Sequence, residues 1–107
     1  MIANELFIIA ERINNKKYFR FAEQLRAAGL SISNNIAEGS GSFSDKDFAN
    51  YLVIARKSIF ECANMLIIFE RMNLVDKEVR ENIFDRLFIL SSQITNFRKT
   101  VLMQKSK

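Results

Sequence analysis

Residues 44–72 read SDKDFANYLVIARKSIFECANMLIIFERM, which combines a helix start signal with apolar residues at helical spacing. Ser44 is an N-cap candidate, and Asp47 follows it in the capping-box position. Phe43 and Phe48 occupy the two positions of a hydrophobic staple around this signal. The stretch therefore predicts a long helix that begins directly after Ser44.

This helix carries two lines of apolar residues. The main face begins at Phe48 and continues at 3.6-residue spacing to Leu66. A second line repeats every seven residues just outside that face and consists of Val53, Phe60 and Ile67. Because aligned rows of large apolar side chains rarely face water, the helix is expected to have two neighbours.

Outward from this segment, turn residues at 14–15, 39–42 and 72–73 divide the chain into four helical segments. The predicted helices span about 3–14, 16–38, 45–72 and 77–103. Short connections between helices favour antiparallel neighbours. The sequence therefore predicts an all-α fold, an antiparallel up-down four-helix bundle in a single domain of residues 1–107 with a short first helix.

The short first helix leaves part of the bundle uncovered. The last helix also bears Phe84 and Phe88 about a right angle away from its main stripe. These features predict a homo-oligomer, with an interface formed by Val53, Phe60, Ile67, Phe84 and Phe88. The alternative is that the first helix docks diagonally and covers more than its length suggests.

Composition excludes several function classes. The chain has 107 residues, of which 49% are hydrophobic and 26% charged, so it is not disordered by composition. It contains no His and one Cys, which removes the usual zinc sites, Ser-His-Asp triads and internal disulfides. No apolar run is long enough for a membrane span. We expect a cytoplasmic protein with no enzymatic activity, no cofactor, no metal and no membrane partner.

The formal charge of +4 is concentrated at one end of the chain. The last ten residues, 98–107, contain Arg98, Lys99, Lys105 and Lys107 and no acid; the remaining twelve basic residues balance the twelve acids. This stretch is either a solubilising tail or a basic arm that binds phosphates. Arg56 and Lys57, which lie near aromatic residues, are a second candidate nucleic-acid contact or, alternatively, a solvated or interface edge.

Other candidate sites have simpler structural interpretations. The Gly-Ser-Gly-Ser run at 39–42 is interpreted as a helix C-cap at Gly39 followed by a turn, rather than as a phosphate loop. Cys62 lies on the apolar face of its helix and is interpreted as a core thiol. Glu38, Glu61 and Glu70 are interpreted as ion pairs or caps rather than as a di-metal site, which would use His as well.

The middle of the chain contains QLRAA (24–28), SISNNIAEG (31–39), KDF (46–48) and SIFE (58–61). This combination resembles the bacterial four helix bundle protein family, whose members are often encoded in intervening sequences of 23S ribosomal RNA genes. NIAEG at 35–39 is its most specific part. Two departures stand out: Ser33 replaces the usual Pro, and residues 40–43 lack the Arg or Lys that many members carry.

The resemblance implies a ring-shaped homo-oligomer, typically a pentamer, with no established enzymatic activity. A relative with the same fold, the accessory variability protein of diversity-generating retroelements, binds a reverse transcriptase and nucleic acid through basic surface. The resemblance implies structural roles for the positions that match the family motif. These positions are Arg26, Asn35, Glu38, Gly39, Ser58 and Glu61.

Two functions follow as expectations. The first is a non-enzymatic, nucleic-acid-associated or ribonucleoprotein accessory protein that binds RNA or DNA through Arg56, Lys57 and the basic end. The second is a protein-interaction scaffold that binds a partner polypeptide such as a reverse transcriptase.

Overall fold

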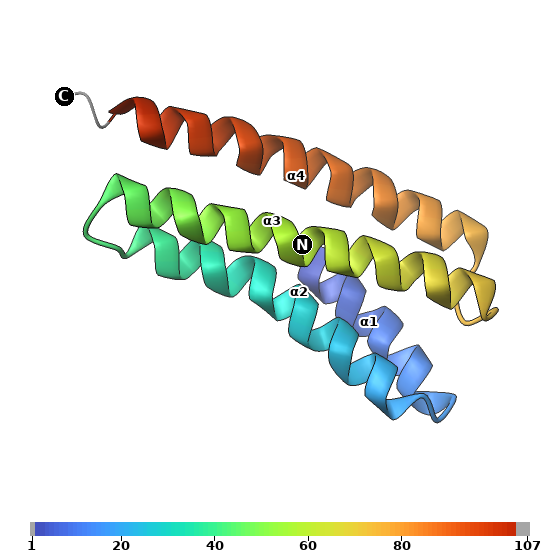
Figure 1. Ribbon diagram of the computed structural model, residues 1–107. Helices are drawn as coiled ribbons and strands as arrows, with labels where there is room; N and C mark the ends of the chain where they lie inside the picture. The colour runs from blue at the N-terminus through green and yellow to red at the C-terminus, as the bar shows by residue number, and fades with distance from the viewer. Residues whose placement is uncertain (1, 105–107) are drawn as a thin grey trace.

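The computed structural model describes residues 2–104, and over this range the protein consists of four helices with no strand (Figure 1). The helices are α1 (Ile2–Asn15), α2 (Phe19–Ser40), α3 (Asp45–Arg71) and α4 (Lys77–Gln104). They alternate in direction along an elongated molecule that measures 52 × 22 × 19 Å. The predicted all-α four-helix bundle is confirmed.

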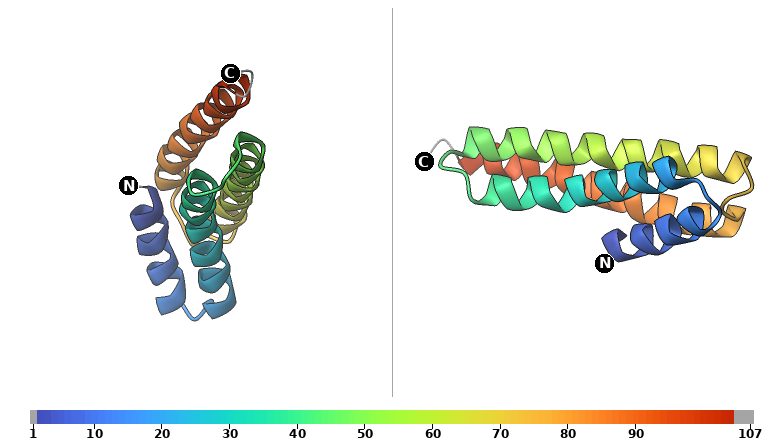
Figure 2. Two further views of the ribbon diagram at one scale, coloured as in Figure 1. Left: turned by 90° about the vertical axis from the view of Figure 1, so that its left-hand side faces the viewer. Right: turned by 90° about the horizontal axis from the view of Figure 1, so that it is seen from below.

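The helices differ in length: α1 has 14 residues and α4 has 28. α3 contacts α2 on one side and α4 on the other, while α1 packs along α2 and reaches the start of α4. α1 approaches α2 closely at Gly29, where an added Cβ would lie 3.3 Å from Leu6 Cδ1. As Figure 2 shows, α1 covers only one half of the bundle's length.

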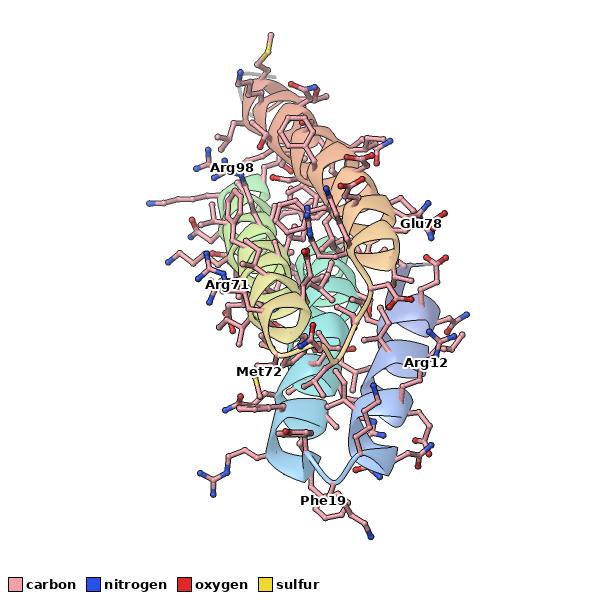
Figure 3. The ribbon with its side chains drawn as sticks, turned by 90° about the vertical axis from the view of Figure 1, so that its right-hand side faces the viewer. Arg12, Phe19, Arg71, Met72, Glu78 and Arg98 are labelled. Atoms are coloured by element: carbon pink, nitrogen blue, oxygen red, sulfur yellow. The ribbon has the colours of Figure 1, made fainter. Side chains whose placement is uncertain are left out.

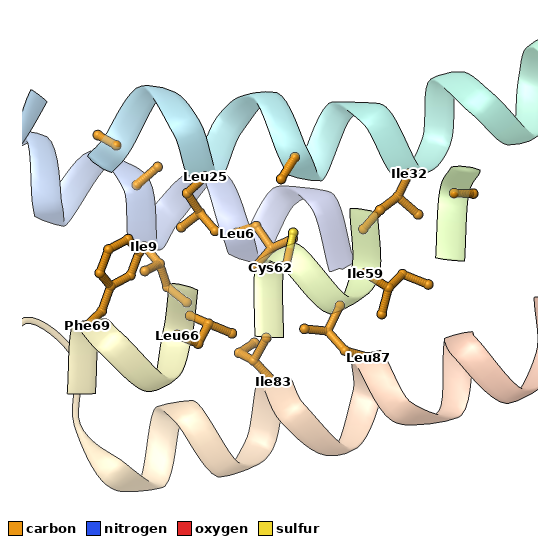
Figure 4. Packing of buried hydrophobic residues seen from close by; sticks show 14 of the residues in the cluster. Leu6, Ile9, Leu25, Ile32, Ile59, Cys62, Leu66, Phe69, Ile83 and Leu87 are labelled. Carbon is orange, nitrogen blue, oxygen red and sulfur yellow. The ribbon is translucent and has the colours of Figure 1, made fainter. Parts of the chain in front are cut away.

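A continuous apolar core joins all four helices. α1 contributes Leu6 and Ile9, and these meet the stripe of α3 that includes Cys62 and Leu66 (Figure 4). The α4 stripe predicted from periodicity is buried at Ile83, Leu87, Ile94 and Val101. Cys62 is wholly buried, which confirms its interpretation as a core thiol.

The start of α3 follows the predicted cap but not the predicted staple. Ser44 is the N-cap, and its hydroxyl accepts a hydrogen bond from the N–H of Asp47 at 3.1 Å. Phe43 is fully exposed, so the staple prediction is wrong. Phe48 packs instead against α4, with its ring edge-to-face to Phe97 at a centroid distance of 5.4 Å.

The second helix begins at Phe19 and not at residue 16, because residues 16 and 17 form a turn after α1 ends at Asn15, and Tyr18 is the N-cap of α2. Lys17 adopts a left-handed conformation with φ of 74°. The N–H of Tyr18 then donates to the carbonyl oxygen of Ile13 at 3.2 Å, and the N–H of Lys17 donates to the carbonyl oxygen of Asn14 at 2.9 Å. These bonds satisfy the last carbonyls of α1, as in a Schellman motif.

The predicted C-cap at Gly39 is also wrong. α2 continues to Ser40, and its C-cap is Gly41, with φ of −92°. Gly39 is buried because α3 lies against it: an added Cβ would lie 2.7 Å from Phe48 Cδ1 and 2.9 Å from Tyr51 Cβ. A glycine stands there because α2 and α3 approach each other closely, and not because the backbone turns.

Candidate functional site

Residues from both predicted apolar lines meet in one groove between α3 and α4. Phe60 of α3 and Phe84 and Phe88 of α4 line this groove, which has a volume of about 520 Å³. Phe88 is 73% exposed and Phe60 is 52% exposed, whereas Leu87 in the same groove is buried. Residues that lie far apart in the sequence thus form a single open apolar surface, which we call the α3–α4 groove.

The other two residues of the predicted interface lie outside this surface. Val53 and Ile67 are half-buried on α3 and do not line the α3–α4 groove. The structure therefore brings together three of the five residues, and the interface itself stays a prediction.

Arginines pack on the aromatic rings of the groove. The guanidinium carbon of Arg56 lies 4.9 Å from the centroid of the Phe60 ring. That of Arg80 lies 5.3 Å from the Phe84 centroid, and Arg80 also pairs with Glu70 at 2.5 Å. Each arginine is placed for a cation–π contact, so Arg56 belongs to the groove as well as to the predicted nucleic-acid set.

The remaining predicted nucleic-acid residues are scattered. Lys57 is exposed on α3 and does not line the α3–α4 groove. Arg98 is half-buried, and its Nε donates a hydrogen bond to the carbonyl of Ala49 at 3.3 Å. Lys99 is exposed. Lys105 and Lys107 lie outside the described residues, so the structure places only the first part of the basic end.

Residues of the family motif form a polar contact between α2 and α3. The hydroxyl of Ser58 donates to that of Ser31 at 2.7 Å. The side-chain amide of Asn35 donates to the same Ser31 hydroxyl at 3.0 Å and to the Ser31 carbonyl at 2.7 Å. Glu61 is exposed at the edge of a shallow groove beside these residues.

The other motif residues lie away from this contact. Arg26 pairs with Glu11 of α1 at 3.0 Å and so links α2 to the first helix. Glu38 is exposed near the end of α2.

The acidic residues and the thiol show no arrangement for metal chemistry. Among residues 2–104, no three His, Cys, Asp or Glu side chains come close enough together to hold a metal ion. Burial, and secondarily the negative charge of Glu61, raise the pKa of Cys62 to about 12. The thiol therefore stays protonated at neutral pH. Within the same described range, no helix is both long and apolar enough to span a membrane.

The sequence analysis missed one surface, the turn between α1 and α2. Phe19, which is 55% exposed, lies at the end of the molecule (Figure 3), and Tyr18 before it is 40% exposed. Lys16, Lys17 and Arg20 are exposed beside them. The sequence contains a signal for this surface, because residues 12–22 hold four basic residues and no acid. The net charge of residues 1–97 is zero, so a charge count over the whole segment does not reveal this basic stretch. We call residues 16–20 the α1–α2 tip.

Comparison with known proteins finds one family and a similar fold. The model of a family described as 23S rRNA-intervening sequence protein matches residues 1–96. A crystal structure of a protein with unknown function from the S23 ribosomal protein family of Bacteroides thetaiotaomicron VPI-5482 is similar, with a TM-score of 0.76 and 25% sequence identity. That match covers 92% of this chain and 99% of the other. No curated protein matches the chain.

Proposed function

Since this chain belongs to the 23S rRNA-intervening sequence protein family, we propose that it is a non-enzymatic RNA-associated accessory protein that acts as a homo-oligomer in the cytoplasm. The observation that carries the proposal is the distribution of charge. Residues 98–107 contain four basic residues and no acid, while the rest of the chain is neutral.

The end of α4 suits a phosphate contact for a physical reason. Arg98 is held against the start of α3 by its bond to the Ala49 carbonyl, and Lys99 beside it is exposed. A cluster of cations that binds phosphates releases condensed counterions, so its affinity depends steeply on salt. In an oligomer the cluster would be repeated once per subunit, which strengthens binding through multivalency.

The test is a titration of a labelled RNA hairpin with the full chain at several salt concentrations. A variant with Lys99→Gln, Lys105→Gln and Lys107→Gln removes three charges but keeps Val101, which is buried and would be lost on truncation at 98. We expect weaker binding, with a plot of log K against log salt less steep by roughly 2–3 units, since each phosphate contact contributes about 0.7–0.9.

The control is Lys46→Gln with Lys77→Gln, which removes two charges elsewhere on the surface and should leave the slope nearly unchanged. If the wild-type protein does not shift the hairpin at low salt, the proposal is wrong. An unchanged slope in the triple variant would show that the C-terminal end is not the phosphate contact.

The α3–α4 groove supports a second proposal, a protein–protein contact through an apolar surface. An apolar groove of about 520 Å³ with Phe88 73% exposed is the kind of surface that helices cover in complexes. We propose that a second copy of this chain covers it, as a step toward the ring-shaped pentamer expected from the family resemblance. A partner polypeptide such as a reverse transcriptase is the alternative occupant, and its recovery in a pull-down after nuclease treatment would favour the scaffold.

A further inference from the structure

The α1–α2 tip ends a column of aromatic rings that starts in the core. Phe69 near the end of α3 is 2% exposed, and its ring centroid lies 5.8 Å from that of Phe21 at a tilt of 45°. Phe21 in turn stacks on Tyr18, with a centroid distance of 5.8 Å and an interplanar angle of 8°. Tyr18 is therefore supported from the core side while 40% of its surface remains open to solvent.

The backbone holds this ring in a defined position. Tyr18 follows Lys17, whose left-handed conformation is secured by the two hydrogen bonds that close α1. Tyr18 is also the N-cap of α2, and its carbonyl accepts a hydrogen bond from the N–H of Ala22 at 3.0 Å. An aromatic surface that is fixed before binding loses little conformational entropy when a flat ligand stacks on it.

Exposed basic residues flank Tyr18 along the chain. Lys16, Lys17 and Arg20 are exposed, and within the described part of the chain their side chains form no ion pair or hydrogen bond. Glu11, the acid that precedes them on α1, is paired with Arg26. The tip thus combines exposed aromatic rings with unpaired cations, which is the combination that single-stranded nucleic acids require.

We propose that the α1–α2 tip is a contact site for single-stranded RNA, in which an unpaired base stacks on Tyr18 and the flanking phosphates contact Lys16, Lys17 and Arg20. Phe19, which is 55% exposed beside Tyr18, provides a second surface for a neighbouring base. The proposal rests on the RNA association proposed above but uses a different part of the molecule from residues 98–107.

The direct test uses tryptophan fluorescence, because the chain contains no Trp. The Tyr18→Trp variant places a single fluorophore at the end of the aromatic column. Titration of the full-length variant with a short oligouridylate should quench its emission in a saturable way, because a stacked base quenches indole fluorescence. The matched control is Phe43→Trp, which adds a fully exposed indole beside Asp45 and Asp47 and should show no saturable quenching.

Two further variants measure the contributions to affinity. Tyr18→Leu with Phe19→Leu removes both rings while it keeps apolar side chains, and it should weaken oligouridylate binding about thirtyfold or more, since each stacked base contributes at least about 1 kcal/mol. Lys16→Gln with Lys17→Gln should make the slope of log K against log salt less steep by about 1.4, which corresponds to two single-strand phosphate contacts. Gln suits position 17 because it introduces no β-branch at a positive φ.

The outcomes separate this site from the proposed function. If RNA binds and the Lys99, Lys105 and Lys107 variant weakens binding while the emission of the Tyr18→Trp variant stays constant, the tip proposal is wrong and the proposed function stands. If oligouridylate quenches the Tyr18→Trp variant and the double Leu variant binds less tightly, the tip site is established whatever the C-terminal variant does. A response of the Tyr18→Trp indole to phosphatidylserine vesicles but not to RNA would overturn the proposal in favour of a membrane contact.

Discussion

The hydroxyl of Ser58 on α3 lies 2.7 Å from the hydroxyl of Ser31 on α2, and Ser58 is only 4% exposed. Asn35, one turn further along α2, donates to the same Ser31 oxygen. Three residues of the SISNNIAEG and SIFE motifs thus form one polar contact between two helices that are otherwise joined by apolar packing. Such a contact favours one register of α2 against α3, because a shift along the helix would break the interhelical bond and leave the Ser58 hydroxyl with only the Ile54 carbonyl of its own helix, at 3.2 Å.

The first prediction concerns this contact. Ser58→Ala should lower the free energy of unfolding by about 1 kcal/mol, because it removes the interhelical hydrogen bond at a buried position. Urea denaturation followed by circular dichroism measures the change. The control is Ser33→Ala, because the Ser33 hydroxyl bonds to the Leu30 carbonyl of its own helix. Equal effects of the two substitutions would contradict a special role for the Ser31–Ser58 pair.

The second prediction concerns the approach of α2 to α3. Gly39→Ala should destabilise the protein by about 1–3 kcal/mol, because its Cβ would overlap with Phe48 and with the Cβ of Tyr51. Gly41→Ala is the matched control, since its Cβ would meet carbonyl oxygens at 3.8 Å, an ordinary contact. Thermal unfolding of both variants measures the difference. A stable Gly39→Ala variant would show that α2 and α3 pack less closely than the structure indicates.

The third prediction concerns Cys62 and pH. Its pKa is raised to about 12 by burial first and by the charge of Glu61 second, from an ordinary value of 9.0. The folded state therefore binds this proton more tightly than the unfolded state. The resulting stability is fully present below pH 9 and is lost progressively between about pH 9 and 12, where only the unfolded thiol ionises.

Two measurements check this behaviour. Cys62 should react with an aromatic disulfide reagent at pH 8 only after the protein is unfolded in urea. In the Cys62→Ala variant, which creates a cavity and lowers stability at every pH, the decline of stability above pH 9 should be shallower than in the wild type. Rapid labelling of the native protein would be inconsistent with a buried, protonated thiol.

The fourth prediction concerns the α3–α4 groove. Light scattering on the purified protein should give several times 12.4 kDa, and Phe88→Asp should reduce this mass because it places a charge in the proposed interface. The substitution should leave the helix content unchanged, since Phe88 is 73% exposed within one chain. Ile89→Asp is the control: Ile89 is also exposed, at 55%, but does not line the groove. A wild-type monomer would contradict the oligomer proposal.

Much of the fold could be predicted because helix signals are local. The N-cap at Ser44 and the apolar stripe of α3 depend on residues within a few positions of one another, and both predictions are confirmed. The start of α2 was misplaced by three residues, because the left-handed turn at Lys17 uses a residue type with no turn preference. The prediction for Gly39 was wrong for a related reason. A residue without a Cβ is required at this position because Phe48 and Tyr51 of α3 lie against it, and these contacts are not visible in the local sequence.

The sequence by itself determined that this chain forms four helices, which faces they bury and which family it resembles, since periodicity, capping residues and motifs are all properties of nearby positions. Only the tertiary structure decided which distant residues meet. It placed Phe60 and Phe88 in one groove, and it joined Tyr18 to Phe69 through Phe21. The reason is that these distances depend on how α2, α3 and α4 pack against one another, and that packing leaves no trace in the spacing of residues along a single helix.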